Sequence, residues 1–469
     1  MNRRRTKIVC TVGPASNDWN TMRAMQEAGM DAVRINMSHA TQEDAARCVE
    51  IVNRLNHELR YPIPIMLDTN GPEIRTGTLS KPLLLKQGEL VVVSGSEKPK
   101  GLENLPVIQV GYPRFEGTVR VGDTIRFDNG LINLKVKEKA EQGLMCYVLD
   151  GGKLGSRKHV NLPGVFVELP AISAKDEEDV KFAKEHDVSF IAQSFVRSPS
   201  DIQAMRSLLG ESHQWVKVIA KIENQEGVRE VESIAAASDA LMVARGDLGI
   251  ETDISALPRL QRNLVQTTLK LGRRCLIATH LLESMVENPI PTRAETIDVA
   301  NAVYEGVDAV ILSAETSVGQ RPAVAVQQLR RIIEESEQAP GLDFSQALIT
   351  NDVKQNVAWS AVELAKRINA SGIMVVTRSG YMADLVTNCA PLDVPILAFS
   401  NSMKTRTRLM VNRSVYTHSI PFDSDPEKTI QTALQVLAER ENVQPSDRFV
   451  LVSDVLSHSG VESIQIRQI

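Results

Sequence analysis

Charged and hydroxyl side chains recur where short apolar runs of strand length end. Arg34, Asn36 and Ser38 close one such run and share one face, because a strand has a period of two. Five other runs end in Asp68-Thr69, Lys221-Ile222-Glu223, Arg245-Gly246-Asp247, Thr279-His280 and Ser313-Ala314-Glu315. A single Lys–Glu or Arg–Asp pair is more often a structural salt bridge than a catalytic group. Six strand ends of this kind together predict a functional cluster.

Two carboxylates of this cluster are suited to a divalent cation. Glu223 and Asp247 follow adjacent apolar runs and offer hard oxygen ligands. Mg2+ commonly takes one or two carboxylates and completes its coordination with water and substrate oxygens. The pair therefore predicts a magnesium site that is filled in part by substrate.

Four cations accompany the carboxylates, and no covalent nucleophile does. Arg34, Arg75, Lys221 and Arg245 supply positive charge for a phosphoryl group or a carboxylate. The spacing shows neither a Cys–His pair nor a Ser–His–Asp arrangement, and His39 and His280 stand alone, which favours structural or hydrogen-bonding roles. A metal among cations favours phosphoryl transfer, which depends on positioning and charge neutralisation. Because no glycine-rich nucleotide loop is present, a nucleotide must be held by charge.

The apolar runs alternate with helical stretches, which is the pattern of a parallel sheet with crossover helices. Eight such units predict a (β/α)8 TIM barrel, whose chemistry lies at the carboxyl ends of its strands. We expect strands at 7–12, 32–36, 64–68, 189–193, 216–222, 240–244, 275–278 and 309–313. We expect helices at 18–28, 41–59, 176–186, 199–209, 228–237, 257–271 and 323–337, and one that opens with a capping box at Thr292 and Glu295.

Two further segments interrupt or follow the barrel. Short strands at 90–93, 119–121, 124–127, 134–136 and 145–149 predict a small inserted β-barrel domain. After residue 340 a second α/β pattern predicts helices at 352–369 and near 382–388, with strands at 373–376, 395–399, 449–452 and 464–466. The expected domains are 1–70 with 171–340, the insertion 71–170, and the C-terminal α/β domain 341–469.

Composition narrows the class of protein. The 469 residues carry 53 basic and 58 acidic side chains, a mixed and mild charge that predicts neither a nucleic-acid nor a membrane partner. Only 4% of the residues are aromatic, and no apolar run is long enough to span a bilayer. The cysteines are scattered and odd in number, which predicts reduced, buried thiols in a cytoplasmic protein: Cys10, Cys48, Cys146, Cys275 and Cys389.

Several long motifs at these strand ends resemble pyruvate kinase. The similarity runs from about residue 6 to residue 322 and continues more weakly to the C-terminus. The motifs are Lys221-Ile-Glu-Asn-Gln-Glu-Gly227, Met242-Val-Ala-Arg-Gly-Asp-Leu-Gly249, Leu67-Asp-Thr-Asn-Gly-Pro-Glu-Ile-Arg75, Asn161-Leu-Pro-Gly164 and Pro291-Thr-Arg-Ala-Glu295.

The resemblance implies transfer of the phosphoryl group of phosphoenolpyruvate to ADP, which gives pyruvate and ATP in the last step of glycolysis. It implies Mg2+ (or Mn2+) at Glu223 and Asp247. It also implies K+ at four residues with oxygen ligands, Asn36, Ser38, Asp68 and Thr69.

The resemblance also implies roles for the other residues of the cluster. Lys221 and Arg34 match groups that act on the transferring phosphoryl group, and Gly246, Asp247 and Thr279 match the cradle of the substrate carboxylate. The proton relay to the enolate falls on Thr279, Ser313 and Glu315. The nucleotide is expected at Asn36, His39, Arg75 and Lys158, with Lys158 reaching in from the insertion.

Some positions depart from the family pattern, and two other functions stay open. Asn70 and Val318 stand where lysines are usual, Ala40 and Ala314 replace glycines, and His280 replaces a glutamine. One alternative is a carbon–carbon lyase of pyruvate or phosphoenolpyruvate, which leaves Arg75, Lys158 and the insertion without a purpose. The other is a non-catalytic relative, which has no need of Lys221, Glu223 and Asp247.

Further expectations concern regulation and assembly. The insertion is expected to be a mobile lid, and Glu73, as an acidic residue beside the K+ ligands, to require that ion. The loop with Thr377, Ser379 and Gly380 follows a strand and opens a helix, which predicts a site for a phosphorylated effector. The family resemblance implies a homotetramer.

Overall fold

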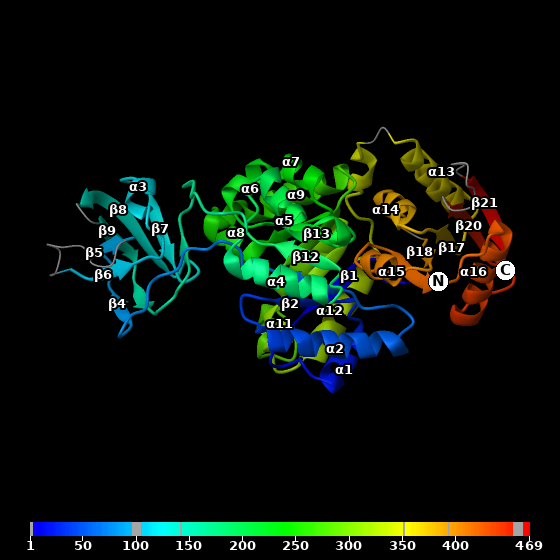
Figure 1. Ribbon diagram of the computed structural model, residues 1–469, viewed down its shortest axis with the longest axis horizontal. Coiled ribbons are helices and arrows are strands. Elements are labelled where there is room, and N and C mark those ends of the chain that lie inside the picture. Colours follow the sequence, from blue (N-terminus) through cyan, green and yellow to red (C-terminus); the bar gives the residue numbers. More distant parts are fainter. Residues whose placement is uncertain (1–2, 96–104, 141–142, 350–351, 393, 454–462) are drawn as a thin grey trace.

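The computed structural model describes residues 3–95, 105–140, 143–349, 352–392, 394–453 and 463–469. Three parts follow one another along its long axis (Figure 1). A β-rich part lies at one end, a closed barrel with its helices lies in the centre, and an α/β part lies at the other end. The predicted fold class is confirmed.

The central barrel is closed by eight parallel strands. The first strand pairs with the last, with Lys7 opposite Ala309, and with the second, with Val9 opposite Ala32. In order around the barrel the strands are β1 (Lys7–Val12), β16 (Ala309–Leu312), β15 (Arg274–Ala278), β14 (Ala240–Ala244), β13 (Lys217–Ile222), β12 (Phe190–Gln193), β3 (Ile65–Asp68) and β2 (Ala32–Asn36). All eight predicted strands are present, within one residue at each end.

Alternate residues of each strand face two different cores. Val9, Met66 and Ile219 belong to a cluster inside the barrel, whereas their neighbours Ile8 and Leu67 pack outward against the helices. Both sets are fully buried. This double burial explains why the strands are continuous apolar runs rather than alternating ones.

The helices that cover the barrel begin at defined caps. Asp18, Thr41, Ser173 and Thr292 accept hydrogen bonds from the first turns of their helices, and Thr292 forms the predicted capping box with Glu295. The helices are α1 (Trp19–Ala28), α2 (Gln42–Glu58), α4 (Ala174–Glu185), α5 (Pro199–Leu209), α6 (Gln225–Arg229), α7 (Val231–Ala237), α9 (Leu257–Lys270), α10 (Arg293–Tyr304) and α12 (Pro322–Ser336). The helix predicted at 228–237 is therefore wrong as one unit, because the chain breaks at Glu230 into α6 and α7.

The chain leaves the barrel after β3 and returns to it at α4. The β-rich part has its own buried cluster, which runs from Ile74 to Leu162. Its strands form a six-stranded sheet and a separate two-stranded ladder. These strands are β4 (Leu83–Leu85), β5 (Leu90–Ser94), β6 (Val107–Gln109), β7 (Thr124–Phe127), β8 (Ile132–Ala140), β9 (Gly143–Asp150), β10 (Gly152–Leu154) and β11 (Val160–Asn161).

The strand predicted at 119–121 is wrong. A short helix, α3 (Phe115–Thr118), precedes it, and the chain then turns through Gly122 at φ 91°. Val119 is buried beneath this turn while Val121 is exposed, so the valines mark a turn packed on one side.

The C-terminal part is a five-stranded sheet with helices on both faces. Its strand order is β19 (Val415–Ser419), β18 (Ile396–Ser400), β17 (Gly372–Val376), β20 (Arg448–Ser453) and β21 (Ser463–Gln468), and β21 alone is antiparallel. Its helices include α13 (Val353–Arg367) and α14 (Tyr381–Asn388), as predicted, and three elements the sequence did not predict: α15 (Met403–Leu409), β19 and α16 (Pro426–Arg440).

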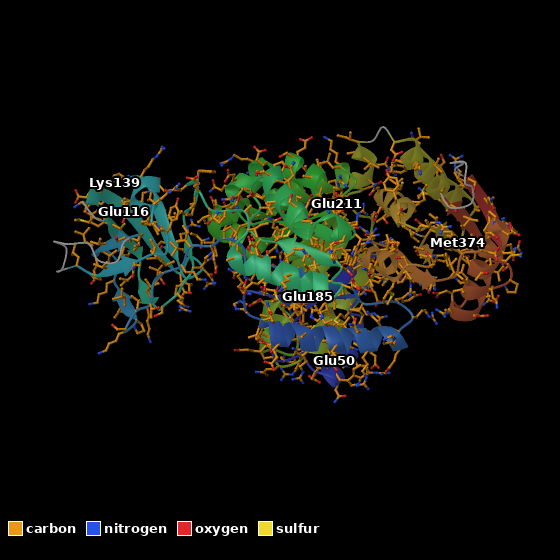
Figure 2. All side chains as sticks on the ribbon, in the orientation of Figure 1. Glu50, Glu116, Lys139, Glu185, Glu211 and Met374 are labelled. Carbon is orange, nitrogen blue, oxygen red and sulfur yellow. The ribbon has the colours of Figure 1, made fainter. Side chains whose placement is uncertain are left out.

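Charged side chains line the outer surface of the helices. Glu50 on α2, Glu185 on α4 and Glu211 are exposed, whereas Met374 on β17 is fully buried within the C-terminal sheet (Figure 2). None of the described helices combines the length and the apolar character that crossing a bilayer requires.

Candidate active site

Asp68 is the centre of a buried charge network at the carboxyl end of the barrel. It is the last residue of β3 and has no exposed surface. One carboxylate oxygen, Oδ2, accepts a hydrogen bond of 2.6 Å from Arg34 Nε on β2, and the other, Oδ1, lies 2.8 Å from Lys221 Nζ on β13. Burial opposes ionisation, but Arg34 and Lys221 outweigh it and lower the pKa of Asp68.

Lys221 connects Asp68 to the predicted metal ligand. Its Nζ lies 2.6 Å from Ser194 Oγ and 3.0 Å from Glu223 Oε1. Burial disfavours the ammonium ion, yet the carboxylates of Asp68 and Glu223 raise the pKa of Lys221 above its usual value. The ammonium group is therefore a permanent positive charge in a dry site, where electrostatic effects are strongest.

Glu223 and Asp247 carry more negative charge than their surroundings neutralise. Burial raises the pKa of Glu223 to about 7, Lys221 opposes the rise, and Asp247 adds to it. Burial also raises the pKa of Asp247. A divalent cation would stabilise both ionised carboxylates, so this donor set fits Mg2+.

Protein side chains do not complete a metal site here. Within the described part of the chain, no three His, Cys, Asp or Glu side chains are grouped so as to hold a metal ion. Two carboxylates that leave coordination positions for other oxygens match the preference of Mg2+ for substrate and water.

The turn after β15 has an unusual backbone. Thr279 and His280 have φ values of 72° and 52°, in the left-handed region that side chains other than glycine rarely adopt. Each such residue costs about 1–2 kcal/mol. Thr279 Oγ1 accepts a hydrogen bond of 2.7 Å from the backbone N–H of Gly246, and a Cβ at position 246 would lie only 3.4 Å from that oxygen.

Arg245 does not supply charge for a substrate, and this prediction is wrong. It is the first residue of α8 (Arg245–Glu251), which begins directly after β14, and it is only 6% exposed. Its guanidinium donates to both carboxylate oxygens of Asp298, at 2.8 and 2.7 Å, and to the backbone carbonyls of Thr279 and His280. The structural interpretation of an Arg–Asp pair holds for this residue.

Glu315 likewise binds backbone. It lies on α11 (Ala314–Ser317) with no exposed surface, and its two oxygens accept the N–H groups of Leu282 and Ser313, at 3.0 and 2.7 Å. Burial raises its pKa. The Ser313 hydroxyl is buried without a hydrogen-bond partner.

The β-rich part brings one histidine to the site. His159 Nδ1 lies 4.0 Å from Asp247 Oδ1, and its Nε2 lies 3.6 Å from Glu73 Oε2. Glu73 also pairs with Arg75, whose NH1 donates to the carbonyl of Arg157 at 2.9 Å. Burial lowers the pKa of His159.

Other predicted residues lie at the rim with local partners. Lys158 Nζ is 2.9 Å from Asp128 Oδ1, so in this structure it pairs within the β-rich part. Asn36 ends β2 and its Oδ1 accepts the N–H of Ser38, so Ser38 lies in the turn rather than on the strand. His39 follows and is exposed.

Sequence reasoning missed Ser194 and His159. The Ser194 hydroxyl donates to the carbonyl of Thr69 at 2.7 Å, and its backbone N–H donates to Thr69 Oγ1 at 3.2 Å, so it connects Lys221 to the end of β3. It follows β12 directly, so the rule applied to the other strand ends could have found it. His159 has no signal of this kind, because it approaches Asp247 only through the arrangement of the two parts.

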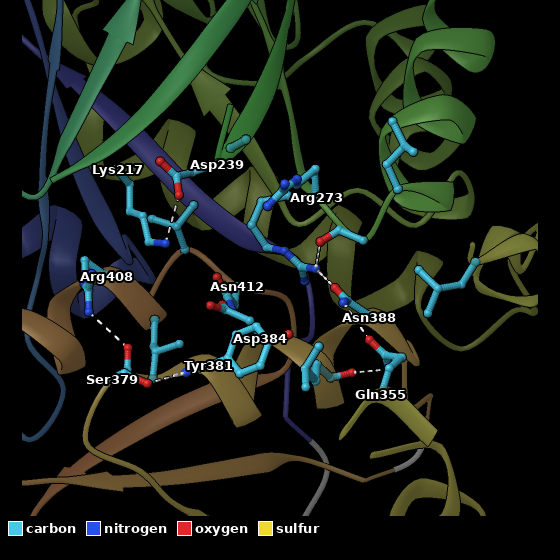
Figure 3. A pocket seen from close by; sticks show the side chains of 18 of the residues that line it. Lys217, Asp239, Arg273, Gln355, Ser379, Tyr381, Asp384, Asn388, Arg408 and Asn412 are labelled. Atoms are coloured by element: carbon cyan, nitrogen blue, oxygen red, sulfur yellow. Dashed lines mark hydrogen bonds and ion pairs between the residues drawn. The ribbon is translucent and has the colours of Figure 1, made fainter. Parts of the chain in front are cut away.

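A cavity of about 270 Å3 lies between the barrel and the C-terminal part. Figure 3 shows Ser379 and Tyr381 at its edge, with Arg408 and Arg273 on different sides. The predicted effector loop lines it, but Thr377 Oγ1 accepts the N–H of Gly380 at 3.0 Å and Ser379 Oγ accepts that of Tyr381 at 3.3 Å. The two hydroxyls thus cap their own loop.

The fold and the charge network define a class of enzyme: a TIM barrel with a cationic, carboxylate-bearing site at the carboxyl ends of its strands. Family models identify it further. The model "Pyruvate kinase, barrel domain" matches residues 3–326, and "Pyruvate kinase, alpha/beta domain" matches residues 355–466.

Curated relatives agree with these models over nearly the whole chain. A pyruvate kinase of Geobacillus stearothermophilus is 38% identical over 97% of this chain and 78% of its own length. Plastidial pyruvate kinase 2 of Arabidopsis thaliana is 35% identical over 100% of this chain and 81% of its own. Pyruvate kinase isozyme G, chloroplastic, of Nicotiana tabacum is 34% identical over 99% and 84%. The chain belongs to the pyruvate kinase family of phosphotransferases.

Proposed function

We propose that this enzyme transfers the phosphoryl group of phosphoenolpyruvate to ADP in the last step of glycolysis, with Mg2+ (or Mn2+) and K+ as cofactors. The observation that carries the proposal is the network in which Lys221 connects Asp68, Ser194 and Glu223. It holds one ammonium group beside a carboxylate pair suited to a metal ion.

Each buried cation has a defined task in this reaction. The Lys221 ammonium neutralises negative charge on the transferring phosphoryl group and on the enolate that remains. Arg34 is fixed by Asp68 and, through NH1, by Thr11 Oγ1 at 2.9 Å, so it presents its charge without rearrangement. Mg2+ at Glu223 and Asp247 would supply Lewis-acid neutralisation of the phosphoryl and carboxylate oxygens.

Proton delivery to C3 of the enolate belongs to the hydroxyl side of the site. Thr279 lies against the N–H of Gly246, and Ser313 has a free buried hydroxyl. Glu315 is engaged with two backbone N–H groups, which supports a role in orienting Ser313 and the segment around Leu282. We therefore propose that Thr279 and Ser313 carry the relay and that Glu315 orients it.

The nucleotide is proposed to bind between the barrel rim and the β-rich part. Arg75 and Lys158 approach from that part, and Asn36 and His39 stand on the rim. Closure of the β-rich part would move Lys158 from Asp128 towards the phosphates and exclude water from the transferring group.

One assay tests the proposed reaction. Phosphoenolpyruvate and ADP with Mg2+ should give equal amounts of ATP and pyruvate, and the pyruvate, coupled to lactate dehydrogenase, should oxidise NADH. Consumption of phosphoenolpyruvate without ATP would favour the lyase alternative. No consumption of either substrate would favour the non-catalytic relative.

We further propose that the cavity between the barrel and the C-terminal part binds a phosphorylated effector. Arg273 Nε is buried there without a hydrogen-bond partner, and burial lowers the pKa of Arg408. An anion would compensate both cations. Titration with sugar monophosphates and nucleotides should shift the activity curve, and Ser379→Glu should abolish the shift. Unchanged curves would show that the effector site is not there.

The setting of the enzyme is proposed on other grounds. The five cysteines are free and buried, which supports a reducing, cytoplasmic environment. A homotetramer is proposed from the family resemblance. Ile290, just before α10, and Ile297, on α10, are exposed and support a contact between copies. Light scattering of the purified protein would measure its mass.

A further inference from the structure

The turn between β15 and the short helix at 283–286 is fixed by two buried charged side chains of opposite sign. Thr279 and His280 both have left-handed backbone conformations, which persist only where the surroundings hold them. Arg245 binds the carbonyls of this turn, and Glu315 binds the N–H of Leu282 just beyond it. The turn therefore depends on contacts outside its own sequence.

Arg245 uses all of its donors in this arrangement. Nε and NH2 donate to the carbonyl of Thr279 at 3.2 and 2.6 Å, and NH2 also donates to that of His280 at 3.1 Å. NH1 donates to Asp298 on α10 and lies 3.4 Å from Gln261 Oε1. Since no N–H group is left for a ligand, the guanidinium binds the carbonyls of the turn instead of a substrate.

We propose that Arg245 is a positioning residue for Thr279. Held by Asp298, its guanidinium keeps the carbonyls of the turn pointing away from the site, and this keeps the Thr279 hydroxyl against the N–H of Gly246 at the rim. The proposal rests on the proposed function, in which Thr279 carries the proton relay together with Ser313. It assigns to the Arg245–Asp298 pair an effect on chemistry at a distance.

Arg245→Lys tests the proposal, because a lysine keeps the charge but cannot bind two carbonyls and a carboxylate at once. We expect kcat to fall about tenfold to a hundredfold, the scale of a misplaced reacting group. We expect the KM for ADP to stay within about twofold. Exchange of the methyl protons of pyruvate with D2O, followed by NMR, should fall by the same factor as kcat, because it isolates the C3 proton transfer.

A matched control stands on the neighbouring helix. Arg262 donates to Glu305 and Asn301 but does not contact the turn. Arg262→Lys should therefore leave kcat and the exchange rate unchanged. Asp298→Asn keeps the guanidinium and removes its counterion, and it should show part of the Arg245→Lys loss. Should Arg245→Lys fail to fold, Asp298→Asn decides the question by the same two measurements.

A rescue experiment separates positioning from general destabilisation. Glycine adopts the left-handed region without steric cost, so His280→Gly makes the turn depend less on Arg245. In the Arg245→Lys background, His280→Gly should raise kcat by about threefold or more. In the wild-type background the same substitution should not raise kcat. Effects that simply multiply, or wild-type rates in Arg245→Lys, would overturn the proposal.

Failure of the proposed function would look different. In that case the wild-type enzyme itself would form no ATP, while a crystal structure of Arg245→Lys would still report the turn. Left-handed φ values retained at 279 and 280 in that structure would overturn the proposal independently of activity.

Discussion

At the scale of single residues, Asp68 decides how the site is charged. Each of its oxygens binds a different cation, so Arg34 and Lys221 are held at a fixed separation before any substrate arrives. Breaking such a buried network leaves an uncompensated charge, which is more costly than losing one contact. The cations of this site are therefore preorganised.

Lys221→Met should lower kcat by at least about a hundredfold, because the ammonium group acts most where negative charge develops in the transition state. The KM for phosphoenolpyruvate should change less. Steady-state kinetics measure both constants. Lys217, at the other end of the same strand and paired with Asp239 at 2.9 Å, provides the control: Lys217→Met, assayed without effector, should retain kcat. An unchanged kcat in Lys221→Met would remove this residue from the mechanism.

Glu73 provides a test of the proposed K+ dependence. The proposed K+ ligands are Asn36, Ser38, Asp68 and Thr69, and the nearby acidic residue Glu73 shares its charge with Arg75 and His159. Replacing a large inert cation by K+ at constant ionic strength should raise activity strongly. Glu73→Lys, which places an ammonium group beside these oxygens, should blunt the response.

Activity without K+ would contradict the proposed K+ dependence. Full activity in tetramethylammonium alone would show that the Glu73–Arg75 ion pair is sufficient. Glu73→Gln serves as a second variant, since it removes the charge without adding a cation.

At the scale of elements, the sequence predicted the barrel better than its surroundings. The strands are buried on both faces, so their apolar runs are unambiguous. The elements missed between 403 and 440 are mostly polar. In β19, Tyr416 and His418 lie against Tyr61 of the barrel part, a contact that the local sequence pattern does not reveal. The side-chain orientation of Arg245 could not be predicted. It points towards Asp298 because α8 begins at Arg245 itself, directly after β14.

The β-rich part should act as a lid. Besides its two connections, it meets the barrel through side-chain contacts such as Asn161 with Glu251 at 2.7 Å and His159 with Asp247. Gly71 at one connection has φ 72°, and a Cβ there would lie 2.7 Å from Ser194 Cβ, so this position accommodates only glycine. Small-angle scattering should show a more compact particle with Mg2+ and phosphoenolpyruvate. An identical profile with and without them would count against the lid.

At the scale of the whole molecule, a buried polar network joins the barrel to the C-terminal part. Glu441 pairs with Arg3, accepts from the Tyr61 hydroxyl and lies 3.2 Å from His418 Nε2. Nearby, Lys7 is fully buried, and its Nζ donates to the carbonyl of Val415 at 2.6 Å. These contacts make the relative placement of the two parts dependent on charge.

The stability of this junction should fall in acid. Burial acts against the ionised form of Glu441, but hydrogen bonds from His418 and Tyr61 and the charge of Arg3 lower its pKa from 4.5 to about 2. Because its pKa is lower in the folded state, the carboxylate stabilises the fold at pH values above its pKa in the unfolded chain. This stabilisation is lost as the pH falls towards the pKa of the folded state. Denaturant midpoints should therefore decrease between about pH 5 and about pH 3.

Glu441→Gln should remove most of this pH dependence and lower the free energy of unfolding at neutral pH by about 1–3 kcal/mol. The control is Glu427→Gln, which breaks an exposed pair with Arg467 and should change stability little. If the stability of Glu441→Gln falls with decreasing pH as steeply as that of the wild type, other groups cause the acid sensitivity.

The pairing of β1 with β16 has a consequence for synthesis on the ribosome. Cys10 lies opposite Leu312, so the first strand waits for about 300 further residues before its partner emerges. The β-rich part completes its own core between 74 and 162 and can fold during this interval. The half-built barrel meanwhile presents an open edge of apolar strands to its surroundings. Slowing translation between β3 and β16 should therefore lengthen the aggregation-prone interval and increase the nascent chain's need for chaperones.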